Sequence, residues 1–265
     1  TKEPEKEPVI IKTIEGIVED VKDDYLVLNE FDDEKNLTEI HIKTKDTSKY
    51  CKYDYVTVTY SNRTEPTKEG DPVVIEALDI KVDILTCDKP IIYFYPEQDT
   101  ECTVNLNLAG KLTCAYPEYQ NEWQFTAKPD GTLVFPDGKE YYALYWEGTS
   151  TAMWDFSKGF CVKGEDTAEF LEWALAAQGL NAREANEFIV YWLPLMQENP
   201  YNIISFQTNI YEDIAKLNIN PAPDSMLRIF MAYYKSDTAV EIEAQEFTPF
   251  ERTGFTVVEW GGGKV

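Results

Sequence analysis

Histidine is nearly absent from this sequence. His41 is the only one in 265 residues, and it lies in the stretch EIHIK, where Ile40 and Ile42 are expected on the buried face of a strand. A Ser-His-Asp or Cys-His hydrolase needs an imidazole to accept the proton of its nucleophile. A zincin needs two histidines on one helix face. One strand histidine supports neither arrangement, so this chain alone builds neither kind of site.

Long apolar runs and nucleotide-binding motifs are missing as well. No stretch approaches the ~18 apolar residues that a membrane span needs, so no direct membrane insertion is predicted. The C-terminal GGGKV lacks the spacing of a phosphate-binding loop, and no G-x-G-x-x-G follows a strand. Residues 263–265 are therefore expected to be a frayed tail. No cofactor is predicted.

Basic residues are scarce. The chain has 24 Lys and Arg against 48 Asp and Glu, which gives a formal net charge of −24. Affinity for nucleic acid rests largely on Lys and Arg that neutralise phosphates, and an acidic surface repels a phosphate backbone. We therefore predict no nucleic-acid partner and no docking on anionic lipid. Uncharged and cationic ligands remain open, and the sequence indicates no oligomeric state.

The cysteine spacing excludes two kinds of site. The five cysteines are Cys51, Cys87, Cys102, Cys114 and Cys161. None is in a C-x-x-C pair, which excludes zinc-knuckle and thioredoxin-like sites, and no metal site is predicted. Cys102 and Cys114 flank an expected hairpin turn, so they either form a disulfide across two strands or serve as small buried residues. The pairing stays open at this point.

The first part of the chain is expected to be a tether followed by a small barrel. Residues 1–9 are charged and contain proline, which is typical of a flexible tether. Residues 10–85 contain short alternating stretches and no good helix, which favours a small β-barrel. The long first strand with Gly16 at its bend indicates an OB-like one. The expected strands are 10–21, 24–31, 38–45, 53–61 and 72–82.

A second domain is expected over residues 89–262, after a boundary at Thr86–Pro90. It contains two blocks of strand-like stretches with a helical hairpin between them, which predicts an antiparallel α+β domain. The expected strands are 91–96, 102–108, 122–129, 132–135, 141–146, 203–208, 215–220, 226–234, 240–247 and 254–260.

The helical hairpin is predicted from capping signals and spacing. Asp166 with Glu169 and Asn181 with Glu184 each fit an N-cap and its reciprocal partner. Pro194 ends or kinks the second helix. The stripes at helical spacing include Trp173 and Trp192, which are expected in the core. Glu187 lies off its stripe, so a solvated position is expected.

Two stretches place carboxylates beside aromatic rings. Tyr145, Trp146 and Glu147 end one predicted strand, and Glu259 precedes Trp260 near the end of another. A glycoside hydrolase needs two carboxyls about 5 Å apart for retention or about 6.5–9.5 Å apart for inversion. The same rings could instead hold a sugar face or a cation. The plainest alternative is a solvated Glu at a strand end beside a packed Trp.

Several phrases resemble those of one family of secreted or lipid-anchored proteins from Gram-positive gut bacteria, a family with no assigned activity. These phrases are KPIIYFYPE (89–97), YPEY (116–119), YWEG (145–148), KGFCVKGEDT (158–167), NEFIVYWLPLMQENPYN (186–202) and ERTGFTVVEWGG (251–262). The resemblance covers residues 89–262, and the region before it looks like small OB-like domains of bacterial lipoproteins. The resemblance implies a location outside the membrane, with a lipidated cysteine upstream of Thr1 as the anchor.

These observations lead to one main hypothesis and two alternatives. The main hypothesis is an extracellular, non-catalytic module that binds a glycan or a peptide on a surface formed by Tyr145, Trp146, Glu147, Glu259 and Trp260. The first alternative is a carboxylate-dependent glycoside hydrolase that uses Glu147 and Glu259. The second is a purely structural domain of the cell envelope.

Overall fold

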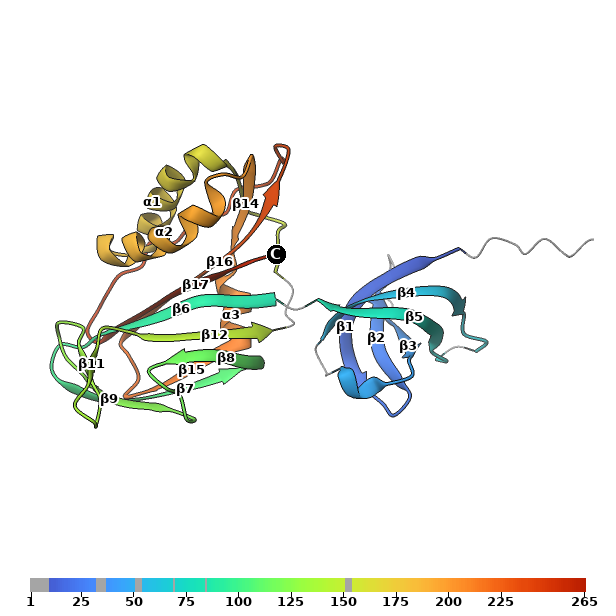
Figure 1. The fold of residues 1–265 in the computed structure, drawn as a ribbon, viewed down its shortest axis with the longest axis horizontal. Helices are drawn as coiled ribbons and strands as arrows, with labels where there is room; N and C mark the ends of the chain where they lie inside the picture. Colours follow the sequence, from blue (N-terminus) through green and yellow to red (C-terminus); the bar gives the residue numbers. More distant parts are fainter. Residues whose placement is uncertain (1–9, 32–36, 51–53, 69, 84, 151–153) are drawn as a thin grey trace, which may run out of the picture. The chain divides into compact units, whose positions relative to one another are not determined.

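The chain forms two compact units, the first containing strands β1 to β5 and the second containing the helices and strands from β6 to β17 (Figure 1). The computed structural model describes residues 10–31, 37–50, 54–68, 70–83, 85–150 and 154–265. Of the described residues, 51% are in strands and 17% are in helices, which confirms the prediction of a β-rich chain with some helix. No helix in the described part of the chain is both long enough and apolar enough to cross a membrane.

Five strands form the first unit. They are β1 (Lys12–Val21), β2 (Tyr25–Phe31), β3 (Leu37–Lys43), β4 (Tyr55–Thr64) and β5 (Val73–Asp83), and a short 3₁₀ turn (Thr47–Lys49) follows β3. They close into a barrel in the order β1-β2-β3-β5-β4, with β3 and β5 parallel. Alternate apolar residues such as Val18, Ile40 and Val56 fill its interior. His41 is on the outward face of β3, where its ring stacks on Tyr25 with centroids 4.1 Å apart.

Two sheets and a helical layer form the second unit. The larger sheet has the order β13-β14-β16-β17-β6-β12-β8, and the smaller has the order β11-β10-β9-β7-β15. Figure 1 shows α1 and α2 on one face of the larger sheet and the smaller sheet on the opposite face. The larger sheet is therefore buried on both faces.

The strands and helices of the second unit have the following residue ranges. The larger sheet contains β6 (Leu85–Tyr95), β8 (Gly110–Tyr116), β12 (Leu144–Ser150), β13 (Phe160–Lys163), β14 (Tyr201–Phe206), β16 (Ser225–Ser236) and β17 (Thr256–Lys264). The smaller sheet contains β7 (Thr100–Leu108), β9 (Trp123–Ala127), β10 (Leu133–Val134), β11 (Glu140–Tyr141) and β15 (Ala215–Asn220). The helices are α1 (Thr167–Gln178), α2 (Ala182–Met196) and α3 (Thr208–Ile214), with a 3₁₀ turn (Gly164–Asp166) before α1.

The helical hairpin is present, with two differences at its ends. The Asn181–Glu184 capping box at the start of α2 is confirmed, with side-chain to backbone bonds in both directions. Asp166 precedes α1 without any side-chain capping bond, because a 3₁₀ turn leads directly into the helix. Pro194 lies inside α2, which continues to Met196.

The buried face of α1 is rotated by one residue from the predicted stripe. The residues that pack inward are Leu171, Ala174, Leu175 and Gln178. One residue corresponds to about 100° around a helix, so Trp173 lies at the margin and is 53% exposed. Its predicted place in the core is therefore wrong, whereas Trp192 on α2 is buried as predicted.

The strand that ends the chain differs from the prediction. Residues 263–265 were expected to be a frayed tail, but β17 continues through Gly263 to Lys264. The glycines are required because neighbouring groups come very close: a Cβ on Gly263 would lie 2.4 Å from the Thr86 carbonyl oxygen. The predicted boundary at Thr86–Pro90 likewise lies inside β6.

The second unit is also not purely antiparallel. Strands β16 and β17 run parallel in continuous register from Ser225↔Thr256 to Tyr233↔Lys264. The connection between them, residues 237–255, is called the strap here. Its stretch 240–247 was predicted to be a strand. Within the described residues, however, the only strand-like pairing of the strap is the isolated β-bridge Lys158↔Glu243.

The predicted hairpin between Cys102 and Cys114 does not form a disulfide. Cys102 is on β7 and Cys114 is on β8, and these strands belong to different sheets. The four cysteines in the described residues are all free thiols, and Cys51 lies outside those residues.

We predict that Gly262→Ala destabilises the second unit by about 1–3 kcal/mol, the cost typical of overpacking a core. The new Cβ would lie 2.6 Å from Cζ2 of Trp192 and 2.7 Å from the Met231 carbonyl oxygen. Urea unfolding followed by tryptophan fluorescence measures this change. Lys264→Ala, on the exposed end of the same strand, is the control and should leave the midpoint unchanged. Equal midpoints for the two variants would contradict the close packing.

Candidate functional site

The two sequence stretches predicted to form a site are close together in the larger sheet. Strand β6 lies between β12 and β17, and Tyr145, Ile91 and Trp260 form one row across the three strands. Leu144, Ile92 and Glu259 form the adjacent row. Because side chains alternate between the two faces of a sheet, the two rows point in opposite directions.

Trp146 and Glu259 point toward the smaller sheet and are fully buried. The Trp146 indole Nε1 donates a hydrogen bond of 3.1 Å to Glu259, and Arg228 Nε donates one of 2.6 Å to its other oxygen. The Arg228 guanidinium also lies 4.6 Å from the ring centroid of Tyr211. Burial, helped by the Glu259 charge, raises the pKa of the Tyr211 hydroxyl. This is a buried, charge-paired cluster that solvent does not reach.

Tyr145 and Glu147 are on the opposite face, under the helices, and both are half-buried. Lys89 Nζ lies 5.2 Å from the Tyr145 ring centroid and 5.3 Å from that of Tyr191 on α2. Burial and a hydrogen bond to Glu147 raise the pKa of the Tyr145 hydroxyl. Burial raises the pKa of Asp88 as well, and the Glu147 charge adds to that rise. These groups therefore interact mainly with one another.

Trp260 is on the same face as Tyr145, but it is completely buried. Its ring makes an edge contact with Phe188, with centroids 5.2 Å apart, and its Nε1 donates a 3.2 Å hydrogen bond to the Tyr93 hydroxyl. That hydroxyl donates in turn to Glu187 at 2.5 Å. Glu187 is thus part of a hydrogen-bonded chain rather than a fully solvated group.

The five predicted residues therefore do not form one exposed surface. Trp146, Glu259 and Trp260 are sealed from solvent. Glu147 and Glu259 point to opposite faces of one sheet, whereas a hydrolase needs both carboxyls beside the same glycosidic bond. The ring and carboxylate pairs found in the sequence stabilise the interior, and the structure gives them no common cleft.

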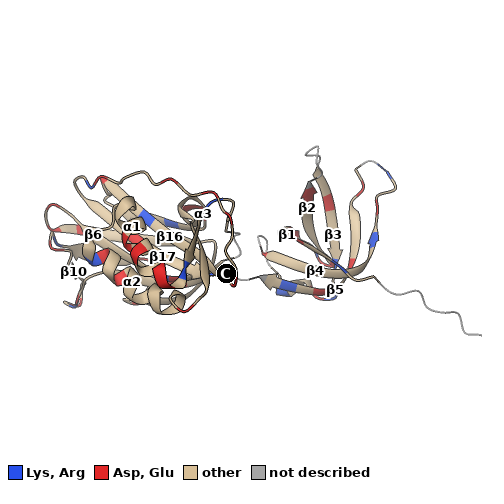
Figure 2. Cartoon of the chain, turned by 90° about the horizontal axis from the view of Figure 1, so that it is seen from above, with Lys and Arg blue, Asp and Glu red and all other residues tan. Residues whose placement is uncertain are grey.

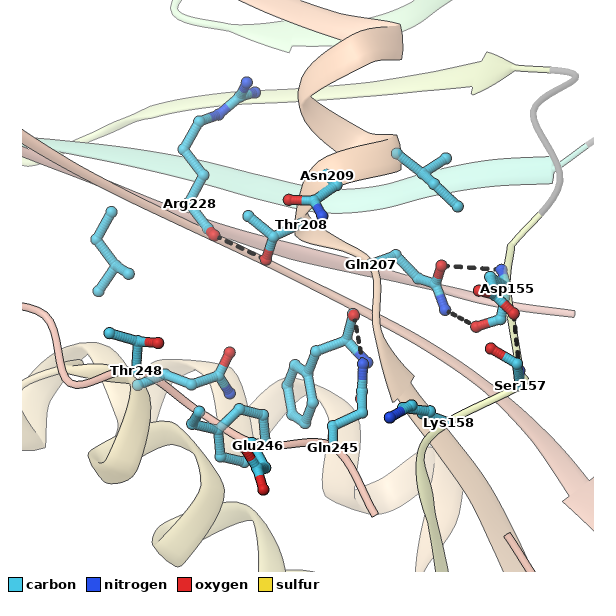
Figure 3. Close-up of a pocket in the computed structure, with 15 residues that line it drawn as sticks. Asp155, Ser157, Lys158, Gln207, Thr208, Asn209, Arg228, Gln245, Glu246 and Thr248 are labelled. Atoms are coloured by element: carbon cyan, nitrogen blue, oxygen red, sulfur yellow. Dashed lines mark hydrogen bonds between the residues drawn. The ribbon is translucent and has the colours of Figure 1, made fainter. Parts of the chain in front are cut away.

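A separate hollow lies on the surface beside the strap. It is a pocket of about 710 Å³. Figure 3 shows Thr208 and Asn209 of α3 on one side and Gln245, Glu246 and Thr248 of the strap on the other. Strand β14 ends at Phe206, whereas its antiparallel neighbour β16 extends further, to Ser225. The sheet is therefore incomplete beside this part of β16, and the pocket lies there.

Two glutamine side chains fix the walls of this pocket. The Gln207 amide accepts a 2.9 Å hydrogen bond from the Asp155 backbone nitrogen and donates one of 2.5 Å to the Asp155 carbonyl. The Gln245 amide bonds to the backbone nitrogen and carbonyl of Phe206 at 2.7 and 2.9 Å. Each side-chain amide forms the two hydrogen bonds, one to an N–H group and one to a carbonyl, that the backbone of a neighbouring strand would otherwise form. The Gln245 bonds attach the strap to the end of β14, and the Gln207 bonds attach the start of α3 to the segment around Asp155.

The groups that face the pocket are mainly uncharged hydrogen-bonding groups with an aromatic wall. Asn209 and Thr248 are exposed, and Phe206 and Phe247 line the apolar side. The Arg228 guanidinium points away from the labelled amides in Figure 3, toward its partner Glu259.

The charges at the rim do not form a cationic or metal-binding site. The Asp155 pKa is lowered by hydrogen bonds from Ser157, and the Lys158 pKa is raised by its hydrogen bond to Glu243. No group of three or more His, Cys, Asp and Glu suited to a metal ion occurs among the residues that the structure describes. The pocket thus has hydrogen-bonding capacity and little net charge.

Sequence reasoning missed this pocket because its residues form no motif. Gln207 and Gln245 are far apart in the sequence, and each does its work by bonding to the backbone of another segment. The one available signal was the strap itself, because long irregular connections in compact domains are often functional. Its alternating apolar residues led instead to the prediction of a strand.

Comparisons with known proteins add little. No family model and no solved structure matches the chain. It is 43% identical over 63 residues to a protein of Butyrivibrio fibrisolvens described as "Uncharacterized protein in bglA 3'region". The match covers 23% of this chain and 65% of that relative. The similarity therefore assigns neither a family nor an activity.

We predict that Glu259→Ala costs about 3–5 kcal/mol of unfolding free energy, because it leaves the Arg228 guanidinium buried without its partner. The matched control is Glu243→Ala, which removes a carboxylate paired at 2.6 Å with Lys158 on the exposed surface, where little change is expected.

Urea unfolding followed by tryptophan fluorescence checks this prediction. All six tryptophans lie in the second unit, so the signal reports that unit alone. A Glu259→Ala variant as stable as Glu243→Ala would contradict a structural role for the buried pair.

Proposed function

We propose that the protein is a non-catalytic glycan-binding module of the cell envelope and that the pocket beside the strap is its binding site. The observation that carries the proposal is a pocket lined mainly by uncharged hydrogen-bonding groups, with an aromatic wall. Small-molecule sites typically combine an apolar lining with a few fixed polar groups.

Neutral sugars match this lining chemically. Each sugar hydroxyl both donates and accepts hydrogen bonds, and the side chains of Asn209, Thr248 and Glu246 offer donors and acceptors at the pocket surface. The C–H face of a pyranose ring is apolar and suits the wall formed by Phe206 and Phe247.

The charge of the protein narrows the class of glycan. Figure 2 shows Asp and Glu distributed over the elements of both units, and the net charge is −24. Such a field lowers the local concentration of anions. We therefore propose neutral glycans, rather than sulfated or uronic-acid polymers, as ligands.

The proposal includes an extracellular location and an OB-like first unit. The location rests on the resemblance of residues 89–262 to secreted or lipid-anchored proteins, and a lipidated cysteine upstream of Thr1 would be the anchor. The strand order β1-β2-β3-β5-β4, with a parallel β3–β5 pair, supports the OB-like assignment. Proteolysis of intact cells tests the location: a protein protected until the cells are lysed would contradict it.

We predict that Asn209→Ala weakens binding of a neutral glycan about tenfold, or about 1.4 kcal/mol, because a polar group at the pocket surface is lost. Thr248→Trp should abolish binding by filling the pocket. An array of neutral and anionic oligosaccharides identifies the ligand, and calorimetry measures its affinity. The matched control is Asn107→Ala, which removes an exposed asparagine side chain from β7, outside the pocket.

Two results would overturn this proposal. One is an array on which no glycan binds saturably, which would favour a purely structural domain. The other is a glycan bound equally well by the wild type, Thr248→Trp and Asn107→Ala, which would place its site outside the pocket.

A further inference from the structure

Trp173 is a large aromatic side chain that is not buried in the core. It is 53% exposed on α1. Its ring is nevertheless fixed, because it contacts Phe160, Phe170 and Phe247 with centroids 5.7 to 5.8 Å apart. A large ring that is both held in place and open to solvent is suited to stacking against a ligand.

The indole lies beside a second hollow of about 620 Å³. Its polar lining includes Tyr201 of β14, Lys163 of β13, and the carboxylates of Asp166 and Glu169 around the start of α1. Charges of both signs therefore lie around the ring. The rest of the lining is apolar and includes Phe170, Ala239 and Val240. An aromatic ring with hydrogen-bonding groups around it suits a sugar ring, which has an apolar face and hydroxyls at its edge.

Phe247 connects this hollow to the pocket beside the strap. It lines that pocket and lies 5.4 Å from Phe206 and 5.7 Å from Trp173, measured between ring centroids. Helix α1 makes a second connection, because Gln178 of the same helix also lines the pocket. The two hollows thus share the strap and α1 as walls.

We propose that Trp173 forms a second subsite and that the ligand is an oligosaccharide chain long enough to occupy both hollows. This inference rests on the proposed function and extends it, because it specifies a polymer rather than a mono- or disaccharide. One sugar unit is held in the pocket by hydrogen bonds, and a later unit of the same chain stacks on the Trp173 indole.

The test is the dependence of affinity on chain length. The probes are cello-, xylo- and manno-oligosaccharides from the disaccharide to the hexasaccharide, titrated by calorimetry into the full chain. The wild type should bind the hexasaccharide of the recognised series about tenfold more tightly than its disaccharide, a difference of about 1.4 kcal/mol. Trp173→Ala should remove this gain and leave disaccharide affinity unchanged.

Two further variants separate stacking from a general loss of structure. Trp173→Phe keeps an aromatic face and should retain most of the gain with chain length. Leu195→Ala removes another side chain that is 53% exposed, from α2, and should behave as the wild type. Circular dichroism checks that each variant is folded.

The outcomes distinguish this inference from the function on which it rests. If none of these series binds and no glycan on the array binds, both proposals fail. If the wild type binds disaccharide and hexasaccharide equally, or if Trp173→Ala keeps the gain with length, the pocket stands as a sugar site and the second subsite is wrong. An equal loss of affinity for both lengths in Trp173→Ala would also overturn the second subsite.

Discussion

The parallel pairing of β16 and β17 is the constraint on which the rest of the second unit depends. Antiparallel strands can be joined by a tight turn, whereas parallel strands need a long connection that returns to the starting edge. Here that connection is the strap rather than a helix. It has no regular structure of its own, and besides the bridge at Glu243 it is fixed by the side chains of Gln245 and Phe247. The same contacts build the wall of the pocket.

The same strand pair also positions the buried charges. Arg228 and Glu259 are paired residues in the parallel register, so their side chains leave the sheet on one face and meet at 2.6 Å. Burial would strongly disfavour either charge alone. The pair, completed by the Trp146 indole, satisfies the carboxylate in the interior between the two sheets. Glu259, next to Trp260 in the sequence, is therefore an element of packing in the interior.

The region where the larger sheet is incomplete, at the end of β14, is both ordered and accessible to solvent. Strand β14 ends early, α3 begins at once, and the strap crosses beside them. The amides of Gln207 and Gln245 satisfy backbone groups that a longer strand would have satisfied, so the region stays ordered without a continuous sheet. Ordered walls lower the entropic cost of binding. Phe247 extends this order to Trp173, whose ring is exposed but not free.

The sequence was informative wherever local periodicity decides the structure. Alternation identified all five strands of the first unit, and the Asn181–Glu184 pair marked the start of α2. Prediction from the sequence failed where contacts with residues distant in the sequence decide the local structure. The glycines at the end of β17 seemed suited to a loose tail, but they lie against Trp192 and the backbone of β6 and β16. The stretch 240–247 alternates like a strand, yet among the described residues it forms only one isolated β-bridge, at Glu243.

By itself, then, the sequence determined the β-rich α+β class, the helical hairpin and the exclusion of histidine-based chemistry, because composition and short-range spacing suffice for these. Only the tertiary structure decided which carboxylates and rings meet and which remain accessible. The face on which a strand residue lies depends on which sheet covers it, and the pocket is made by segments that are distant along the chain. Glu259 became a buried partner of Arg228, and Trp173 became an exposed ring, for that physical reason.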